Sequence, residues 1–271
     1  MTGRDRRPYH VLVTGAAGGV GHRLCRTLRR HGFDVRGLVR PGDDTRSLQL
    51  SPGDLCVGQV QDPKAVDRAM DGVEAVVHCA ALLPDALDRG AAAFREVNVE
   101  GTRNVMAHAM IHRLERVIAM STISVVDHVT RAITPSSLLD YVAGPTDPYL
   151  ASKIEAEKLL LGMSREFHGA VQVLRLAYVY GPGTYAVWRQ PLRLLQQGTL
   201  RLIGDGAAPL PLLYADDLAR FVATALGEPP AGGSAAIHVL ANPQPTTVRA
   251  VFDVIADHLR VPRPRSVPLW A

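Results

Sequence analysis

A short β-branched strand that runs directly into a cluster of glycines constrains the fold of this chain more than any other feature of its sequence. Residues 10–14 read HVLVT, and the following residues, GAAGGVG, lead into a segment whose leucines recur at helical spacing. Gly15, Gly18 and Gly21 allow a tight turn and a close approach of the backbone to a pyrophosphate, whose charge is favoured by the N-terminus of the helix. The segment therefore predicts a strand, a turn and a helix that bind a dinucleotide.

The alternation of apolar strands with helices continues along the chain. Strands are expected at residues 33–39, 73–80, 116–121 and 171–177, and long helices at 91–112 and 148–167. Apolar strands that do not alternate with polar residues are buried on both faces, and strands separated by helices form right-handed parallel crossovers. The expected fold is α/β, a Rossmann-type doubly wound parallel sheet.

The pattern of long apolar strands and helices ends after Gly181. Beyond it, Gly and Pro residues separate shorter helical segments at 186–197, 215–226 and 246–259. We expect a dinucleotide-binding Rossmann domain at residues 1–180 and a smaller C-terminal substrate-binding lobe at residues 181–271. The lobe should close over the carboxyl edge of the sheet, where ligands bind in such folds. The Pro-rich end stops on the apolar Trp270, which indicates a truncated lobe or a lobe without a terminal helix.

Composition restricts the partners and the compartment. Hydrophobic residues make up 47% of the 271 residues and charged residues 21%, which is typical of globular proteins. No stretch of about 18 uncharged apolar residues is present. The net charge of +4 comes from arginines spread along the chain, so we expect neither nucleic acid nor a membrane as a partner. The three cysteines, Cys25, Cys56 and Cys79, include no CxxC pair, which favours a reducing cytoplasm and no metal site.

Further motifs follow the glycine cluster in a fixed order. They read HCAA at 78–81, NVEGT at 98–102, YLASK at 149–153, YGPG at 180–183 and YADDLA at 214–219. Together with TGAAGGVG at 14–21, they resemble the extended branch of the short-chain dehydrogenase/reductase superfamily, the NAD-dependent epimerase/dehydratase-like and 3β-hydroxysteroid-dehydrogenase-like enzymes. The resemblance implies a nicotinamide-dependent enzyme that forms a homodimer through its two long helices.

The resemblance also implies which residues contact the cofactor. They are Gly15, Gly18, Gly19, Val20, Gly21, Cys79, Ala80, Ala81, Asn98, Tyr149 and Lys153. Asn98 is implied to hold a helix distortion and a water behind Lys153, and an ordinary helix-surface asparagine is the alternative. His78 and Cys79 lack partners at metal-ligand spacing, so we interpret them as packing at a strand end next to the cofactor.

Tyr149 and Lys153 are the expected catalytic pair. Four residues apart on a helix, their side chains share one face. A nearby ammonium lowers a phenol pKa that starts near ~10, which lets Tyr149 transfer a proton closer to neutrality. An exposed pair on a solvated helix is the alternative. The resemblance places Thr122 as the hydroxyl that orients the substrate oxygen, with Ser121 and Ser124 as competitors.

The end of the second strand bears on the choice between NAD and NADP. Arg40 stands at its tip, where an acid would accept the ribose hydroxyls of NAD, and an arginine can pair with the 2′-phosphate of NADP. We therefore expect NADP(H), with NAD(H) as the alternative, since Asp43 and Asp44 follow closely and could reach a ribose. Asp62 resembles the family's aspartate near the adenine, although an Asp before a Pro is also a good helix cap.

The expected substrate is apolar. By the resemblance, extended-branch enzymes that act on nucleotide sugars place an Asn before the YGP segment and an Arg before the aspartate of the smaller lobe, and both residues bind the sugar diphosphate. Here Tyr178 stands at the position of that Asn, and residues 204–213 contain no arginine. These positions therefore lack the positive charge that a diphosphate needs. Tyr178, Tyr185 and Trp188 suit an apolar ketone or secondary alcohol, such as a steroid, terpenoid, polyketide or flavonoid-like compound.

We therefore expect an NAD(P)H-dependent oxidoreductase that interconverts a ketone and a secondary alcohol of such a small molecule. A nucleotide-sugar epimerase or dehydratase with retained NAD is the alternative. A non-catalytic dinucleotide-binding sensor is the third reading, although such a protein has no need of Tyr149 and Lys153.

Overall fold

A parallel sheet forms the centre of the computed structural model, which describes residues 9–127, 132–229, 233, 235–244 and 246–268. Its strands are β1 (His10–Thr14), β2 (Asp34–Val39), β3 (Leu55–Val57), β4 (Ala75–His78), β5 (Arg116–Thr122), β6 (Ala170–Leu176) and β10 (Ala235–Leu240). Their order across the sheet is β10-β6-β5-β4-β1-β2-β3, and every neighbouring pair is parallel. The doubly wound parallel sheet expected from the sequence is confirmed.

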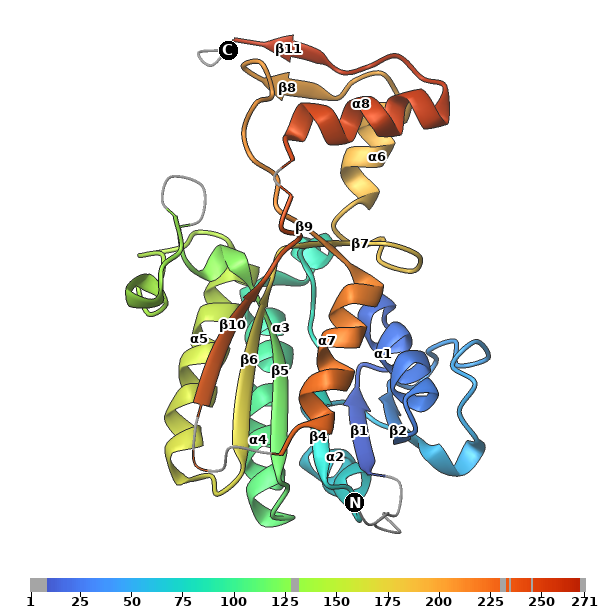
Figure 1. Cartoon of the computed structure of the whole chain (residues 1–271), viewed down its shortest axis with the longest axis vertical. Coiled ribbons are helices and arrows are strands. Elements are labelled where there is room, and N and C mark those ends of the chain that lie inside the picture. Colours follow the sequence, from blue (N-terminus) through green and yellow to red (C-terminus); the bar gives the residue numbers. More distant parts are fainter. Residues whose placement is uncertain (1–8, 128–131, 230–232, 234, 245, 269–271) are drawn as a thin grey trace, which may run out of the picture.

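Helices cover both faces of this sheet (Figure 1). One face carries α1 (Gly19–Arg30) and α7 (Ala215–Gly227), and the other carries α2 (Pro63–Met70), α4 (Gly101–Ile111) and α5 (Pro148–Met163). Each layer buries its own apolar cluster against the strands, so the central strands are covered on both sides. This double burial explains why β1 and β4 carry the continuous apolar runs VLV and AVV.

The long helix expected at 91–112 is not regular. It begins as α3 (Gly90–Phe94), passes through a π-helical segment at Arg95–Glu100 and continues as α4. Asn98 lies in the π-helical segment, so the helix distortion expected at this residue is present. Such π-helical segments are frequent at functional sites.

The smaller lobe lies beyond the carboxyl edge of the sheet (Figure 1). It contains α6 (Arg189–Gln196), β8 (Arg201–Ile203), α8 (Val248–Leu259) and β11 (Arg265–Val267). Leu195, Leu202, Phe252 and Ala256 form its own buried cluster. The short parallel pair of β7 (Tyr178–Tyr180) and β9 (Leu212–Tyr214) leads from the sheet into the lobe and back.

Residues 181–271 are shared between these two parts. They supply the lobe, but they also return to the sheet as α7 and as the edge strand β10, which pairs with β6. The sequence analysis did not anticipate β10 or the three-residue strand β3. The division of the chain at residue 180 stays a prediction about folding units, and Trp270 lies outside the described residues. Within the described ranges, no helix is both long enough and apolar enough to cross a membrane.

Candidate active site

The glycine-rich turn after β1 leaves the N-terminus of α1 open. Gly15 has a φ of 66°, and a Cβ there would lie 2.8 Å from the Cα of Ala80. A Cβ on Gly21 would lie 2.2 Å from the carbonyl oxygen of Gly15. The N-cap residue, Gly18, gives α1 no side-chain cap, and no acidic residue stands in the first turn. The free backbone N–H groups and the helix dipole therefore fit the pyrophosphate of a dinucleotide.

The loop after β7 packs against this turn. A Cβ on Gly19 would lie 2.2 Å from the carbonyl oxygen of Gly183. The YGPG segment therefore contacts the glycine-rich turn directly, and only glycine at residue 19 permits this approach.

A buried chain of hydrogen bonds connects β1, β4 and α4. The Ala80 N–H donates to Thr14 Oγ1 (3.2 Å), which lies 2.8 Å from His78 Nδ1. His78 Nε2 lies 3.1 Å from Thr102 Oγ1, which donates to the Asn98 carbonyl (2.6 Å). Because the Thr102 hydroxyl donates its proton to that carbonyl, its oxygen accepts from the His78 Nε2–H. His78 Nδ1 then carries no proton and accepts from the Thr14 hydroxyl. His78 is therefore neutral, and burial together with the Lys153 charge lowers its pKa to about 3.

Asn98 is buried and fastens the segment after β4 to α5. Its Oδ1 accepts from the Leu82 N–H (2.7 Å), and its Nδ2 donates to the Leu82 carbonyl (3.1 Å) and to Ser152 Oγ (2.9 Å). Ser152 in turn donates to the Tyr149 carbonyl (2.7 Å). The alternative of a helix-surface asparagine is wrong, because Asn98 is 2% exposed. Its proposed water behind Lys153 stays a prediction.

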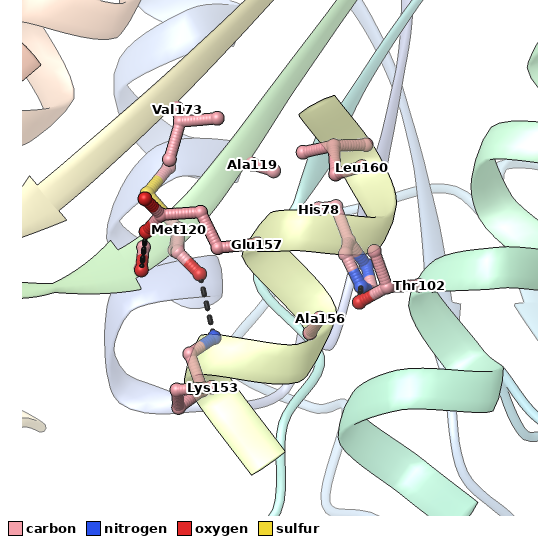
Figure 2. A pocket seen from close by; sticks show the side chains of 10 residues that line it. His78, Thr102, Ala119, Met120, Lys153, Ala156, Glu157, Leu160 and Val173 are labelled. Atoms are coloured by element: carbon pink, nitrogen blue, oxygen red, sulfur yellow. Dashed lines mark hydrogen bonds between the residues drawn. The ribbon is translucent and has the colours of Figure 1, made fainter. Parts of the chain in front are cut away.

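Tyr149 and Lys153 lie on the first turns of α5. The helix begins at Pro148, and its N-cap Asp147 accepts from the Tyr149 N–H (2.9 Å). The half-buried Tyr149 ring packs edge-on against Phe94, with 6.2 Å between ring centroids. The buried Lys153 ammonium donates to the Met120 carbonyl at the end of β5 (2.7 Å), as Figure 2 shows.

The electrostatics of this pair differ from the expectation. Burial, followed by the charge of Asp147, raises the pKa of Tyr149 above its ordinary value, and Lys153 is not among the causes that shift it. Burial lowers the pKa of Lys153 to about 8, although Glu157 and Cys79 raise it. The expected lowering of the Tyr149 pKa by Lys153 is therefore absent, because burial and the Asp147 charge raise this pKa instead.

The three candidate hydroxyls at the end of β5 do different things. Ser121 is buried and donates to Glu157 Oε2 (2.5 Å), so it is not free to hold a substrate. Thr122 Oγ1 accepts from the Ser124 N–H (3.3 Å) and keeps its own proton for another partner. The Ser124 hydroxyl has no partner among the described residues. Thr122 stays the predicted third catalytic residue, and Ser124 its competitor.

A buried ion pair that the sequence analysis missed lies behind this strand end. Glu157 and Arg175 are both less than 4% exposed. Arg175 donates from Nε to Glu157 Oε1 (3.0 Å) and from Nη2 to the same oxygen (2.5 Å), and Tyr141 OH donates to that oxygen too (3.0 Å). The available signal was spacing, because Glu157 follows Lys153 by four residues on α5 and so shares its helix face.

A small cavity lies between β5, α5 and the buried His78–Thr102 pair (Figure 2). It has a volume of about 10 Å³, and His78, Thr102, Ser121, Lys153 and Glu157 contribute to its lining. This is close to the smallest space that holds a water, and its walls are polar. The cavity places the Lys153 ammonium next to both buried hydrogen-bonded networks.

Arg40 and Asp43 meet at the end of β2. Arg40 Nη2 donates to Asp43 Oδ1 (2.9 Å), and its backbone N–H donates to Asp43 Oδ2 (2.9 Å). The Arg40 side chain is 70% exposed and that of Asp43 only 18%. Asp62 caps α2 by accepting from the Lys64 N–H (3.0 Å), which is the alternative role we considered for it. Its contact with an adenine stays a prediction.

The three expected substrate residues are not equivalent. Tyr178 and Tyr185 are 38% and 63% exposed. Trp188 packs against the apolar cluster of the lobe, and its indole N–H donates to the Val179 carbonyl (2.8 Å). Trp188 therefore packs in the lobe, and the contact of all three residues with a substrate stays a prediction.

Burial raises the pKa of the Cys79 thiol, so Cys79 lies at the site as a neutral thiol rather than as a nucleophile. Among the described residues, no group of three or more His, Cys, Asp or Glu side chains is placed to hold a metal ion.

Comparisons with known proteins give a consistent result. A family model described as "NAD dependent epimerase/dehydratase family" matches residues 11–241. The 2-alkyl-3-oxoalkanoate reductase of Stenotrophomonas maltophilia is 30% identical over 261 residues, which cover 93% of this chain and 76% of the relative. A 3-beta-hydroxysteroid dehydrogenase of Mycolicibacterium neoaurum is 28% identical over 217 residues, or 77% of this chain and 58% of the relative.

A solved structure gives the same answer for the fold. The dTDP-glucose 4,6-dehydratase from Streptomyces venezuelae, with NAD and TYD bound, aligns with a TM-score of 0.76 at 28% identity. The alignment covers 96% of this chain and 84% of that one.

Proposed function

Because this chain belongs to the NAD-dependent epimerase/dehydratase family, whose members act on a CH–OH or C=O group, we propose that it reduces a ketone on a mainly apolar small molecule to a secondary alcohol. The observation that carries this proposal is the Lys153 ammonium on the Met120 carbonyl, which holds α5, the helix of Tyr149, against β5, the strand that ends at Thr122. The uncapped glycine-rich turn supports it. The likeness to the 2-alkyl-3-oxoalkanoate reductase of Stenotrophomonas maltophilia supports the choice of a ketone as substrate.

The residues present fit a nicotinamide dinucleotide. Gly18, Gly19 and the open N-terminus of α1 would hold its pyrophosphate, and Lys153 its nicotinamide ribose. The bound cofactor supplies a hydride to the carbonyl carbon.

Tyr149 performs the proton transfer. Burial raises the pKa of Tyr149, so its phenol is protonated at neutral pH and donates its proton to the carbonyl oxygen when the ketone is reduced. Thr122 keeps a free hydroxyl proton and orients the same oxygen. Lys153, fixed on the Met120 carbonyl, has the role of holding the nicotinamide ribose rather than of lowering the Tyr149 pKa.

NADP(H) is the cofactor that Arg40 favours, because an exposed guanidinium at the tip of β2 can pair with a 2′-phosphate. Asp43 opposes this preference, since its carboxylate holds Arg40 and repels a second anion. We also propose a homodimer formed through the helices at 91–112 and 148–167, and a cytoplasmic location.

The substitution Tyr149→Phe tests the mechanism. Turnover of an alkyl ketone with NADPH should fall by about 100-fold to 10,000-fold, the usual share of general acid catalysis. Calorimetric titration should show unchanged cofactor binding. Tyr9→Phe is the control, because Tyr9 precedes β1 at the amino end of the parallel strands, on the side of the sheet away from the candidate site. A Tyr149→Phe enzyme with wild-type turnover would show that this phenol is not the acid.

A nucleotide-sugar epimerase or dehydratase is the second candidate, and the likeness to the dTDP-glucose dehydratase favours it. Such an enzyme keeps its NAD between turnovers. The absorbance spectrum of the purified protein decides between the two: tightly bound NAD would support the second candidate, and an empty protein that binds added NADPH would support the reductase.

A further inference from the structure

One face of α6 forms an open groove outside the catalytic residues. Its volume is about 410 Å³, and its lining consists of Tyr185, Arg189, Leu192, Arg193 and Gln196. Arg189, Leu192, Arg193 and Gln196 recur at helical spacing and share one face of α6. Tyr185 precedes the helix, and its carbonyl accepts from the Arg189 N–H (2.9 Å). Trp188 and Leu195 lie on the other face of the helix and pack into the core of the lobe. The groove face is therefore not needed for the packing of the lobe.

Of the two arginines of this face, Arg189 has a carboxylate partner, Asp85, and Arg193 has none among the described residues. Arg193 is exposed and has no ion-pair partner among the described residues. The Arg189 side chain is 70% exposed, and its Nη1 lies 3.4 Å from Asp85 Oδ2, which is longer than an ordinary hydrogen bond. Most of the guanidinium donors are thus available to a ligand.

The position of the groove connects it to the candidate active site. Asp85 belongs to the segment that follows β4, and Asn98 holds the same segment through Leu82. Tyr185 follows the YGPG loop, whose Gly183 packs on Gly19 of the glycine-rich turn. The groove is therefore next to the carboxyl edge of the sheet, where the reacting carbonyl would lie.

We propose that this groove binds a carboxylate carried by the substrate, with Arg189 and Arg193 pairing with the carboxylate and with Tyr185 and Leu192 contacting an alkyl chain. A planar guanidinium matches a carboxylate in two parallel hydrogen bonds, and two of them next to an aromatic ring and a leucine fit a charged group on an apolar body. The substrate class is then an alkyl-substituted oxo acid and the corresponding hydroxy acid. This inference rests on the proposed reductase function.

The test compares an acid with its neutral ester. The probes are a 2-alkyl-3-hydroxyalkanoate and its methyl ester, oxidised with NADP⁺, which takes the hydride while one proton is released. The wild type should prefer the acid in kcat/KM. Arg189→Gln and Arg193→Gln should each reduce kcat/KM for the acid by about 10-fold or more, mainly through KM, and leave the ester unchanged. Arg201→Gln, at an exposed arginine of the same lobe outside the groove, should change neither.

Each other outcome has a distinct meaning. Equal use of acid and ester, with no effect of either substitution, overturns the carboxylate site and leaves the reductase function intact. If neither probe is oxidised, the proposed function fails for this substrate class, and calorimetric titration of the acid still tests the groove: weaker binding to Arg189→Gln and Arg193→Gln supports the site, and equal binding overturns it. Binding of UDP-glucose that depends on these arginines, without binding of the acid, also overturns it and points to a diphosphate.

Discussion

Replacing Lys153 by Met should stabilise the cofactor-free protein at neutral pH and abolish its turnover. Lys153 is 8% exposed, and burial lowers the pKa of its ammonium from 10.5 to about 8. Since a tenfold change in an equilibrium is ~1.4 kcal/mol, holding this charge inside the protein costs ~3 kcal/mol at pH ~7. Met removes this cost but also the hydrogen bond to Met120, worth ~1 kcal/mol. The expected net stabilisation is ~2 kcal/mol.

The pH dependence of the stability difference separates the cost of the buried Lys153 charge from a general effect of Met on packing. Above its unfolded pKa of 10.5, the lysine is neutral in the folded and the unfolded protein, and its burial costs no charge. As the pH falls, the unfolded protein binds the proton first, and the cost is complete below the folded pKa of about 8. The wild type therefore bears the full cost below pH ~8 and less of it at higher pH. The stability difference between Lys153→Met and the wild type should shrink by ~2 kcal/mol between pH ~7 and pH ~9.5.

Urea denaturation followed by circular dichroism measures both quantities. Lys158→Met is the matched control, because Lys158 is an exposed lysine on the same helix, 4.8 Å from the centroid of the Tyr141 ring. Its free energy of unfolding should change by less than ~1 kcal/mol at either pH. A Lys153→Met protein that is no more stable than the wild type, by a margin that does not change with pH, would refute the reasoning.

Three further substitutions test other parts of the site. Glu157→Gln should destabilise the protein by ~3–5 kcal/mol, because it leaves Arg175 buried without its counter-charge; urea denaturation checks this, and a loss below ~1 kcal/mol would contradict it. Gly19→Ala should weaken NADPH binding by more than about 10-fold in calorimetry, because its Cβ would lie 2.2 Å from the Gly183 carbonyl oxygen. Asp43→Ala should raise the ratio of NADPH to NADH affinity, since it frees the strand-tip arginine for a 2′-phosphate; an unchanged ratio would exclude that arginine from cofactor choice.

The local parts of the site were predictable from the sequence. The turn of Gly15, Gly18 and Gly21 follows a β-branched strand and opens a helix, so its conformation is decided within a few residues. Tyr149 and Lys153 are separated by one helical turn, which fixes their common face without knowledge of any neighbour. The motifs that resemble the epimerase/dehydratase family extended these local patterns to the fold, and the fold is confirmed.

The environment of each side chain was not predictable in this way. The expected lowering of the Tyr149 pKa left out burial, which raises this pKa together with the Asp147 charge. The packing of Trp188 in the lobe and the charge of Arg193, unpaired among the described residues, did not follow from the sequence. In each case the role depends on burial and partners, which a single segment does not contain.

The sequence by itself determined the α/β alternation, the glycine-rich turn and the catalytic spacing, because hydrophobic periodicity and backbone sterics act over a few residues. Only the tertiary structure decided which of the hydroxyls at the end of β5 are free. The pairing of β5 with β6 brings Ser121 opposite Arg175, and Glu157 on α5 accepts hydrogen bonds from both side chains. The Ser121 hydroxyl is therefore already bound, whereas the Thr122 hydroxyl is not. Desolvation and hydrogen bonding are set by such long-range neighbours, and for this reason the chemistry of the site follows from the fold rather than from the motifs alone.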